Sequence, residues 1–583
     1  MFVDLSKKPY ELNKEQIDFV EDVLRGLSLK EKIQQLFVAL LPTRDADILK
    51  TLVKEEKFGG IRYNPGSKED IYLQNKLVQE FSNIPLFVAA NTESGGNGAC
   101  REGTEVGCET KIGATDDVEL AYKLGKVCAK EAKAIGINVL FSPIVDIHYN
   151  FHNPVISNRT FSSDPQKVKK MSLEYLRACN EEGVLACAKH FPGDGFDERD
   201  QHLALSSNPL SVTKWDNSFG KVYSALIKNG LPMVMVGHIS LESYQRKFKP
   251  SLKDEDILPA TLSKEIVTDL LKGQLGFNGL VVTDATHMVG LTSAMSRREL
   301  LPNIIKAGCD MILFYNDYEE DISYMLEGYE KGIFDLERLD DAVRRNLGLK
   351  VKLGYSASRL HLIDEPHYEI VGAKEHKLIS DEVCKKAITL VKNRDNIIPL
   401  NPSRHKRVLL VVQEDENPFS AMMTKPKETI YDYFAKLLEN EGFVVERFVS
   451  LMDKIKNMPP YEAMKAVMNV YGAKTPVSNL VDNYDLVIQM AHFDSHNTVN
   501  RISWKMSKGT ADIPWYVHEL PTIFISLKSP FHLFDVPEVK TYINCYDKNR
   551  NTVEALLRKL VGREDFEGVS PVDAFCNTKN TRY

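Results

Sequence analysis

The sequence predicts an α/β protein in which an N-terminal (β/α)₈ barrel is followed by a smaller α/β open-sheet domain. Over roughly the first 350 residues, short apolar segments rich in β-branched and aromatic residues alternate with segments that have apolar residues at helical spacing. Strands that are apolar on both faces are typical of parallel strands covered by helices, and eight such units close most simply into a barrel. The eight predicted strands are residues 34–41, 58–64, 84–91, 137–147, 184–191, 232–240, 279–285 and 309–315.

The composition changes near residue 400. A helical pattern over residues 376–393 leads into the polar, proline-containing segment IIPLNPSRHK, which is typical of a domain boundary. A second series of strand and helix patterns follows and predicts an open parallel sheet. We therefore expect a barrel domain at residues 1–365, a helical linker at 366–400 and an α/β sandwich domain at 401–583. The strands predicted for this last domain are residues 407–414, 443–450, 485–492, 521–528 and 540–546.

The composition also argues against nucleic acid and membranes as partners. The chain has 583 residues, a net charge of −7 and a pI of about 6.1, whereas nucleic-acid and membrane-surface partners favour basic patches. It contains neither a run of about 18 apolar residues nor a signal-peptide pattern, so we expect a cytoplasmic protein without a membrane partner. The nine cysteines form no CxxC pair and indicate reduced core thiols, and nothing predicts a cofactor. The oligomeric state is left open.

One carboxylate stands at the end of a predicted barrel strand. In a (β/α)₈ barrel, active-site residues come from the carboxyl ends of the strands. Asp284 ends the seventh predicted strand in GLVVTDATHM, which places it at the barrel mouth and partly desolvated, as a carboxylate nucleophile requires. Because Asp is also a favoured helix N-cap, position alone leaves the two interpretations about equal.

A second group of polar residues surrounds the end of the fifth predicted strand, in ACAKHFPGDGFDERDQH. Lys189 and His190 end the strand, and Asp200 and His202 follow in a glycine-rich, acidic loop. The spacing of Asp200 and His202 lets the carboxylate accept a hydrogen bond from the imidazole, which fixes the ring tautomer and raises its basicity. The alternative interpretation is a solvated charged loop. Without further context, the segment favours this alternative.

Other strand-end residues are weaker candidates. Glu93 follows the third predicted strand in NTESGG, where the glycines allow a ligand close to the backbone, although a plain turn is the alternative. Arg159 follows the fourth strand and can hold a hydroxyl or carboxylate bidentately, whereas Asp146 is expected to brace its loop. His238 ends the sixth strand, but no HxH or HExxH spacing accompanies it, so we expect no metal site.

Several segments together resemble glycoside hydrolase family 3 and, within it, the β-N-acetylglucosaminidase (β-N-acetylhexosaminidase) subgroup. The most specific is KHFPGDGFDERDQH (189–202), which is similar to the subgroup's KHFPGHG-x4-DSH signature at the same spacing. The resemblance covers nearly the whole chain. It is supported by FSPIVDI (141–147), NRTF (158–161), PATLSKEIV (259–267), LGFNGLVVTDATHM (275–288), AITLVKNRDNIIPL (387–400) and SLKSPFHLFDVP (526–537).

The resemblance implies a retaining, exo-acting β-glycosidase that removes terminal β-linked sugars by double displacement. Asp284 corresponds to the family nucleophile, His202 to the subgroup's histidine acid/base, and Asp200 to the partner that orients it. A neutral histidine does not repel an incoming anion, so phosphate in place of water is a variant to consider. The substrate-binding positions are Lys189, His190, Arg159, Asn91 and Glu93.

Three positions depart from the subgroup pattern. Asp194 stands where the subgroup has the second histidine of KHFPGHG, and Gln201 replaces the serine of DSH. Asn91 falls where the subgroup has a sugar-binding aspartate, and the run NTESGG is one residue longer before its glycine pair. The first two changes lie beside the expected catalytic atoms. The change at Asn91 weakens the expectation of strict N-acetylglucosamine specificity.

The sequence leaves competing functions open. A family 3 β-glucosidase would take its acid/base glutamate from the second domain, where Glu414 and Glu416 are the candidates. A glycoside phosphorylase and a catalytically inactive sugar-binding protein are further alternatives, and an aldolase-like barrel would form a Schiff base at Lys189. The intact Asp200–x–His202 unit argues against the β-glucosidase, and the presence of Asp284, Asp200 and His202 together argues against the inactive protein. The adjacent histidine and glycine-rich loop fit the aldolase poorly, and Asp284 would have no role in it. The natural sugar, its linkage and the acceptor are not determined by the sequence.

Overall fold

The structure is a computed structural model, and it describes residues 2–41, 43–63, 66–414, 428–456, 458–471, 476–493, 500–504 and 511–583. The chain divides into two compact units. The first contains Met1–Glu109 and Asp117–Ile379, and the second contains Thr110–Asp116 and Ser380–Tyr583. Among the described residues, no helix is both long enough and apolar enough to span a membrane.

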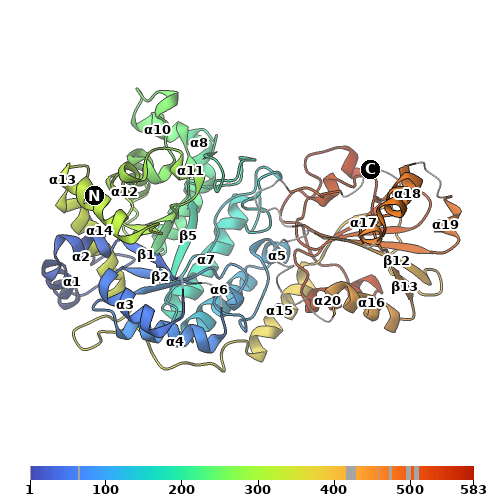
Figure 1. Cartoon of the computed structure of the whole chain (residues 1–583), viewed down its shortest axis with the longest axis horizontal. Helices are drawn as coiled ribbons and strands as arrows, with labels where there is room; N and C mark the ends of the chain where they lie inside the picture. The colour runs from blue at the N-terminus through green and yellow to red at the C-terminus, as the bar shows by residue number, and fades with distance from the viewer. Residues whose placement is uncertain are drawn as a thin grey trace. The chain divides into compact units, whose positions relative to one another are not determined.

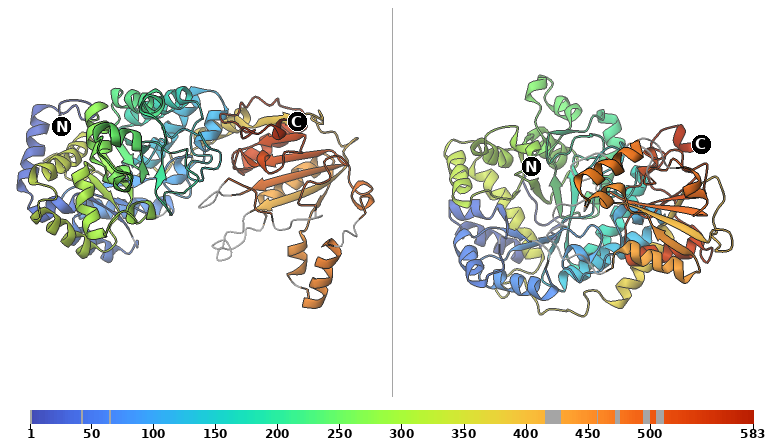
Figure 2. Two further views of the ribbon diagram at one scale, coloured as in Figure 1. Left: turned by 90° about the horizontal axis from the view of Figure 1, so that it is seen from above. Right: turned by 45° about the vertical axis from the view of Figure 1, so that its right-hand side comes forward.

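The first unit is a closed barrel of eight parallel strands, which confirms the predicted TIM-barrel fold. The strands follow one another around the barrel in the order β1-β10-β9-β7-β5-β4-β3-β2, and each lies inside its predicted range. Figure 1 and Figure 2 show helices arranged around the outside of this barrel. The strands are β1 (Phe37–Leu40), β2 (Gly60–Arg62), β3 (Phe87–Ala90), β4 (Val139–Leu140), β5 (Leu185–Phe191), β7 (Met233–Val236), β9 (Leu280–Ala285) and β10 (Met311–Leu313).

Local sequence signals set where the surrounding helices begin and end. The helix α7 (Pro165–Glu182) is an example, because Asp164 caps its first turn, proline occupies the first helical position and Gly183 ends it in the left-handed conformation. The other α-helices of this unit are α1 (Lys14–Gly26), α2 (Leu29–Gln34), α3 (Ala46–Glu56), α4 (Lys68–Glu80), α6 (Val118–Lys133), α8 (Val212–Trp215), α9 (Lys221–Lys228), α10 (Glu242–Phe248), α11 (Val289–Thr292), α12 (Arg297–Ala307), α13 (Tyr318–Glu330) and α14 (Leu336–Lys352).

The first unit also contains a short strand pair and several 3₁₀ and π-helical segments. A small parallel pair, β6 (Ser206–Ser207) and β8 (Ile239–Ser240), closes the loop that follows β5. The helix predicted from residues 262–276 is a π-helix, η5 (Glu265–Gln274). The 3₁₀ and remaining π segments are η1 (Gly96–Gly98), η2 (Asp216–Gly220), η3 (Asp254–Asp256) and η4 (Ala260–Leu262).

The second unit is a six-stranded sheet in the order β11-β16-β15-β14-β12-β13. All five predicted strands are present and parallel. They are β12 (Arg407–Glu414), β13 (Val444–Arg447), β14 (Leu486–His492), β15 (Thr522–Ser526) and β16 (Thr541–Asn544).

The sixth strand, β11 (Thr389–Asn393), corrects the prediction of a continuous helix over residues 376–393. The helix α15 (Lys374–Ala387) ends first, and β11 then pairs antiparallel with β16 at the sheet edge. The β-branched Thr389 and Val391 favour this extended conformation. The sheet is therefore mixed rather than wholly parallel.

Apolar side chains cover both faces of this sheet. One face packs against α15, α16 (Ile430–Asn440) and α20 (Arg550–Leu560) through a core that includes Phe434 and Leu556, and Figure 1 shows α16 and α20 on the same side. The other face carries a second core that includes Phe524 and Tyr542. The remaining helices are α17 (Leu451–Ile455), α18 (Pro460–Tyr471), α19 (Ser478–Val481), η7 (His532–Phe534) and η8 (Asn580–Arg582).

One piece of the second unit comes from the barrel's part of the sequence. Residues 110–116, which contain most of α5 (Glu109–Ala114), lie between barrel strands β3 and β4 in the chain but pack within the second unit. There the buried Lys111 donates to Asp547 at 2.6 Å and to the hydroxyl of Thr552 at 2.8 Å, and it contacts Cys384 Sγ at 3.1 Å. The carboxylate of Asp547 stabilises the buried ammonium, which therefore stays charged.

Candidate active site

Polar side chains gather at the carboxyl ends of the barrel strands. Arg62 is the last residue of β2, and Glu93 lies three residues after β3. Lys189 and His190 directly precede the last residue of β5, and Asp284 directly precedes the last residue of β9. Because the strands of a closed parallel barrel end at one mouth, residues far apart in the sequence meet there.

Glu93 forms the centre of a buried ion-pair cluster. Its two carboxylate oxygens accept hydrogen bonds from Arg159 Nε and Nη2, both at 2.8 Å, and Oε1 also accepts from Lys189 Nζ at 2.7 Å. Burial opposes ionisation of Glu93, but the two cations outweigh it and hold its pKa well below the usual value. The structure thus brings three of the predicted substrate-binding residues into direct contact.

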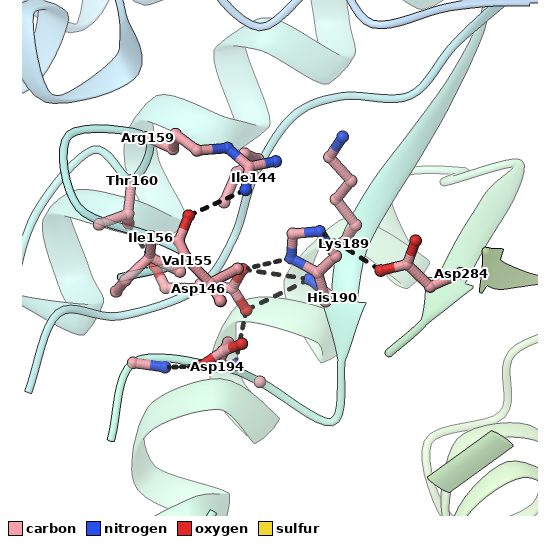
Figure 3. Close-up of polar contacts among 12 residues, drawn as sticks. Ile144, Asp146, Val155, Ile156, Arg159, Thr160, Lys189, His190, Asp194 and Asp284 are labelled. Atoms are coloured by element: carbon pink, nitrogen blue, oxygen red, sulfur yellow. Dashed lines mark hydrogen bonds and ion pairs between the residues drawn. The ribbon is translucent and has the colours of Figure 1, made fainter. Parts of the chain in front are cut away.

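His190 connects Asp146 to Asp284. Its Nδ1 lies 2.7 Å from Asp146 Oδ2, and its Nε2 lies 4.0 Å from Asp284 Oδ2 (Figure 3). The fully buried Asp146 also accepts from the backbone N–H of Asp194 at 2.7 Å. Asp146 therefore braces the strand end, as expected, and turns the second nitrogen of His190 toward Asp284.

Asp284 is an ionised carboxylate at the barrel mouth. Burial raises its pKa, but His190, His238, the Ala285 N–H and Lys189 together lower it by more, so the pKa lies below the usual value. Its Oδ1 accepts from the Ala285 N–H at 2.8 Å, and 18% of the side chain is exposed. The alternative role as a helix N-cap is wrong, because Met288 is the N-cap of α11.

Asp200 and His202 form the pair that their spacing predicts. Asp200 Oδ1 lies 2.6 Å from His202 Nδ1 and accepts the His202 backbone N–H at 2.8 Å. The side chain of Asp200 is buried, whereas 53% of that of His202 is exposed. The hydrogen bond that the His202 ring makes to the Asp200 carboxylate is the largest cause that raises the pKa of His202, and the charge of Asp284 adds to it. His202 thus offers Nε2 to the solvent-facing side of the site.

The loop that carries this pair, residues 192–205, is held at both sides. The backbone N–H groups of Val289 and Gly290 donate to the carbonyls of His202 at 3.0 Å and Gln201 at 3.1 Å. The Gln201 side chain accepts from the His238 N–H at 2.8 Å and donates to Asp194 at 3.3 Å. The two residues that depart from the subgroup signature, Asp194 and Gln201, are therefore partners.

Two buried carboxyl groups in this region, those of Asp194 and Glu109, have raised pKa values. Burial and the neighbouring carboxylate of Asp146 raise the pKa of Asp194 to about 6. Burial also raises the pKa of Glu109, which accepts from the Ile144 N–H at 2.9 Å, well above the usual value. Glu109 therefore stays protonated beside the Glu93 cluster.

The sequence interpretation missed one residue of the mouth, Arg62. Burial lowers the pKa of its guanidinium, and the carboxylates of Glu93 and Asp284 act on it electrostatically. Within the part of the chain that the structure describes, this guanidinium makes no hydrogen bond or ion pair of its own. The signal was present, because Arg62 lies near the carboxyl end of the second predicted strand, residues 58–64, but a charged residue at that position was not considered.

The remaining candidates are Asn91 and His238, which lie at or near the carboxyl ends of β3 and β7. Asn91 directly follows β3 and its side chain is exposed at the mouth side of that strand. His238 lies 2.9 Å from the hydroxyl of Thr261 and 3.0 Å from the Ala285 carbonyl, so both ring nitrogens have protein partners. No set of three His, Cys, Asp or Glu side chains among the described residues is arranged to hold a metal ion.

One of the two rival glutamates, Glu414, is described and belongs to the second unit. Glu414 ends β12, forms an ion pair with Lys548 and lies 3.9 Å from His492 Nδ1. Glu416 falls outside the described residues.

Residues 28–349 match the glycosyl hydrolase family 3 N-terminal domain. The chain therefore belongs to glycosyl hydrolase family 3 and is a glycoside-acting enzyme. It is 38% identical to a β-N-acetylglucosaminidase/β-glucosidase of Cellulomonas fimi over 581 residues, which cover 99% of this chain and 100% of that protein.

Two solved structures extend the comparison. One is the β-glucoside phosphorylase BglX bound to 2FGlc, with a TM-score of 0.90, 39% identity and coverage of 98% of this chain and 99% of that one. The other is a family 3 β-N-acetylglucosaminidase from Paenibacillus sp. str. FPU-7, with a TM-score of 0.75, 25% identity and coverage of 95% and 100%. Relatives of this chain thus include both hydrolases and a phosphorylase.

Proposed function

We propose that this enzyme cleaves terminal β-glycosides with retention of configuration, with Asp284 as the nucleophile and His202 as the acid/base. The observation that carries the proposal is the Asp200–His202 contact of 2.6 Å on a loop beside the ionised Asp284. A nucleophile must be deprotonated and an acid protonated at the same pH, and the two opposite pKa shifts meet both requirements.

In the first step Asp284 attacks the anomeric carbon and His202 Nε2 protonates the leaving oxygen, which gives a covalent glycosyl-enzyme and a neutral imidazole. The negative charge on Asp200, held against Nδ1, stabilises the imidazolium before transfer and keeps Nε2 directed outward. Arg159, Lys189 and His190 are the groups that we propose hold the sugar hydroxyls, because they line the same mouth.

In the second step the neutral His202 accepts a proton from the incoming acceptor, which attacks the anomeric carbon and releases Asp284. The acceptor is water in the hydrolytic reaction. The net outcome is one β-glycosidic bond exchanged for one β-bond to the acceptor, with both residues restored.

We propose that both β-N-acetylglucosaminides and β-glucosides are substrates, with the former as the leading candidate. Support comes from the signature KHFPGDGFDERDQH and from the relative of Cellulomonas fimi, whose name covers both sugars. The exposed Asn91, in place of the subgroup aspartate, argues against strict selection of one of them.

The proposal is tested by trapping the intermediate. An activated 2-deoxy-2-fluoro-β-glycoside should inactivate the enzyme with a mass increase of one fluoroglycosyl group, and peptide mapping should place it on Asp284. The first-formed sugar product, followed by NMR, should be the β-anomer. Labelling of another residue, or an α-anomer as first product, contradicts the proposal.

Phosphorolysis is a second candidate, because the acid/base is a neutral imidazole rather than a carboxylate when the acceptor arrives. The cationic Arg62, without a partner of its own among the described residues, adds positive potential near Asp284, and the BglX relative is a phosphorylase. With an aryl β-glycoside and inorganic phosphate at millimolar concentration, phosphorolysis predicts sugar-1-phosphate as the product. Free sugar with no rate dependence on phosphate would exclude it.

A further inference from the structure

The β5–β6 loop (residues 192–205) and the helix α11 are joined beside the proposed acid/base. The Val289 N–H donates to the carbonyl of His202 itself, and the Gly290 N–H donates to the carbonyl of Gln201. Val289 is the first residue of α11 and follows Asp284 by five positions. The chain that carries the proposed nucleophile therefore binds the backbone of the proposed acid/base directly.

Gly290 allows this contact because it has no side chain. A Cβ at this position would lie 2.5 Å from the Gln201 carbonyl oxygen and 2.8 Å from that of Ala204. Both atoms belong to the loop backbone on either side of His202, so no side-chain rotation can relieve the contact. The backbone of Gly290 does not have a positive φ, so alanine would be tolerated by its conformation and only the close approach requires glycine.

Other contacts hold the opposite side of the loop and leave this one as the support nearest to His202. The Tyr149 and Asn150 N–H groups donate to the Gly195 carbonyl at 3.1 and 2.9 Å, and the Asn153 side chain donates to the Asp197 carbonyl at 2.8 Å. These bonds fix the loop before Asp200. Next to His202, the Gln201 side chain is bound by the His238 N–H, and the two N–H groups of α11 are the groups that bind the backbone carbonyls of Gln201 and His202.

We propose that Gly290 and the Val289 N–H are positioning groups that set the distance between His202 Nε2 and the leaving oxygen. The inference rests on the proposed role of His202 and adds how that role is supported. Because Asp200 and His202 are both on the loop, moving the loop displaces the pair without separating it. The hydrogen bond to Asp200, which is the largest cause that raises the pKa of His202, is kept, so the expected signature is loss of proton transfer with at most a small change in the titration of His202.

The test is Gly290→Ala, measured with two substrates of one sugar. We expect kcat/KM to fall about 10- to 100-fold for a substrate with a poorly acidic leaving group, since small displacements of a catalytic group cost factors of this size. For a 2,4-dinitrophenyl glycoside, which needs little protonation, the fall should be less than about threefold. The alkaline limb of the pH profile should move much less than in Asp200→Asn, because the Asp200–His202 hydrogen bond is kept.

Gly26→Ala is the matched control. Gly26 has open space where a Cβ would lie and does not have a positive φ, so this variant should keep wild-type kinetics with both substrates. An equal loss for both substrates in Gly290→Ala would overturn the proposal, and so would wild-type rates. A shift of the alkaline limb to lower pH as large as that of Asp200→Asn would also overturn it, since the Asp200–His202 contact would then be lost.

A second variant covers the case in which Gly290→Ala does not fold. Val289→Pro replaces the N–H that binds the His202 carbonyl by a ring methylene, so the hydrogen bond is lost and the loop must move away at His202 itself. The helix tolerates the change, because proline is favoured at the first residue of a helix and Met288, with ψ of 138°, has a conformation that suits a residue before proline. The same leaving-group dependence is expected, and its absence in a folded Val289→Pro protein overturns the inference.

His202→Ala, measured in parallel, distinguishes a failure of the proposed acid/base role from a failure of the positioning role of α11. If His202→Ala shows no leaving-group dependence, the proposed acid/base role fails. If it does while both positioning variants behave as wild type, only the inference about α11 fails.

Discussion

Charged side chains are buried at both ends of the barrel, but the two groups differ in how completely they are paired. At the amino-terminal end, Asp310 accepts from Lys272 at 2.8 and 3.0 Å and from the Val281 N–H at 2.8 Å. Each cation of this group contacts at least one carboxylate. The group consists of Lys272, Asp310, Arg338, Asp341 and Arg345, whose side chains are at most 19% exposed.

At the carboxyl-terminal end, the Glu93 cluster is paired in the same manner, but its neighbours keep unused capacity. His202 exposes half of its side chain. Among the described residues, Asp284 receives one backbone hydrogen bond at Oδ1, and its Oδ2 lies 4.0 Å from the His190 imidazole. A saturated network fixes a fold, whereas a network with free donors and acceptors can bind a ligand. The same kinds of side chain thus form a fully paired network at one end and, in the proposed function, carry out chemistry at the other.

The largest effect is expected from Asp284→Asn. If the carboxylate is the nucleophile, turnover should fall by at least about 10⁴-fold, or about 5 kcal/mol at about 1.36 kcal/mol for each factor of ten. The melting temperature should stay close to wild type, because Asp284 is not a saturated partner. The measurement is steady-state kinetics on a purified protein with a thermal melt, and wild-type-like kcat in the folded variant would contradict the assignment.

Asp310→Asn should have the opposite profile. Removing the charge leaves Lys272 and two arginines partly unpaired in a buried site, which costs about 3–5 kcal/mol of the free energy of unfolding. Below the melting transition kcat should be near wild type. Asp254→Asn, which breaks an exposed pair with Arg246, is the control and should cost less than about 1 kcal/mol. A loss of activity without loss of stability in Asp310→Asn would reverse the comparison.

His202→Ala should slow substrates according to their leaving groups. We expect a loss of about 10²- to 10⁴-fold with a disaccharide and a much smaller loss in the first step with a dinitrophenyl glycoside. Pre-steady-state measurement of aglycone release isolates that step. Equal losses on both substrates would mean that His202 has a structural role.

Asp200→Asn should reduce turnover by about 10- to 100-fold near neutral pH and should move the alkaline limb. Asp200 raises the pKa of His202, and the acid form of His202 is needed, so its loss shifts the alkaline limb of kcat/KM to lower pH. The acidic limb, which follows Asp284, should not move.

The smallest effect is expected from Glu414→Ala, which removes a partner of Lys548 in the second unit. Turnover and the pH profile of kcat/KM should stay unchanged in this variant. An essential Glu414 together with a dispensable Asp200 would favour the β-glucosidase mechanism.

Periodicity and strand composition were sufficient to locate all eight barrel strands and five strands of the second sheet. They missed β11 because the helical pattern of α15 runs directly into it, and only pairing with β16, about 150 residues later, makes residues 389–393 a strand. Local pattern cannot report a partner so distant in sequence.

The site was predictable in proportion to how local its contacts are. Asp200 and His202 are two residues apart, so their contact follows from spacing alone. The Glu93 cluster joins residues that are 66 and 96 positions apart, and its members were identified singly, without their mutual contacts. The partnership of Asp194 with Gln201 was also not visible, because each appeared only as a separate departure from a signature.

The excursion of the chain through α5 has a consequence for dissecting this enzyme. Because residues 110–116 belong to the second unit, that unit is discontinuous in sequence and no single cut releases it whole. A fragment that ends at residue 379 keeps α5 but loses Asp547 and Thr552, which leaves the Lys111 ammonium without its partners. Gene truncation is therefore expected to give an insoluble barrel. Replacing residues 110–116 by a short polar linker is the route to a barrel that can be purified alone.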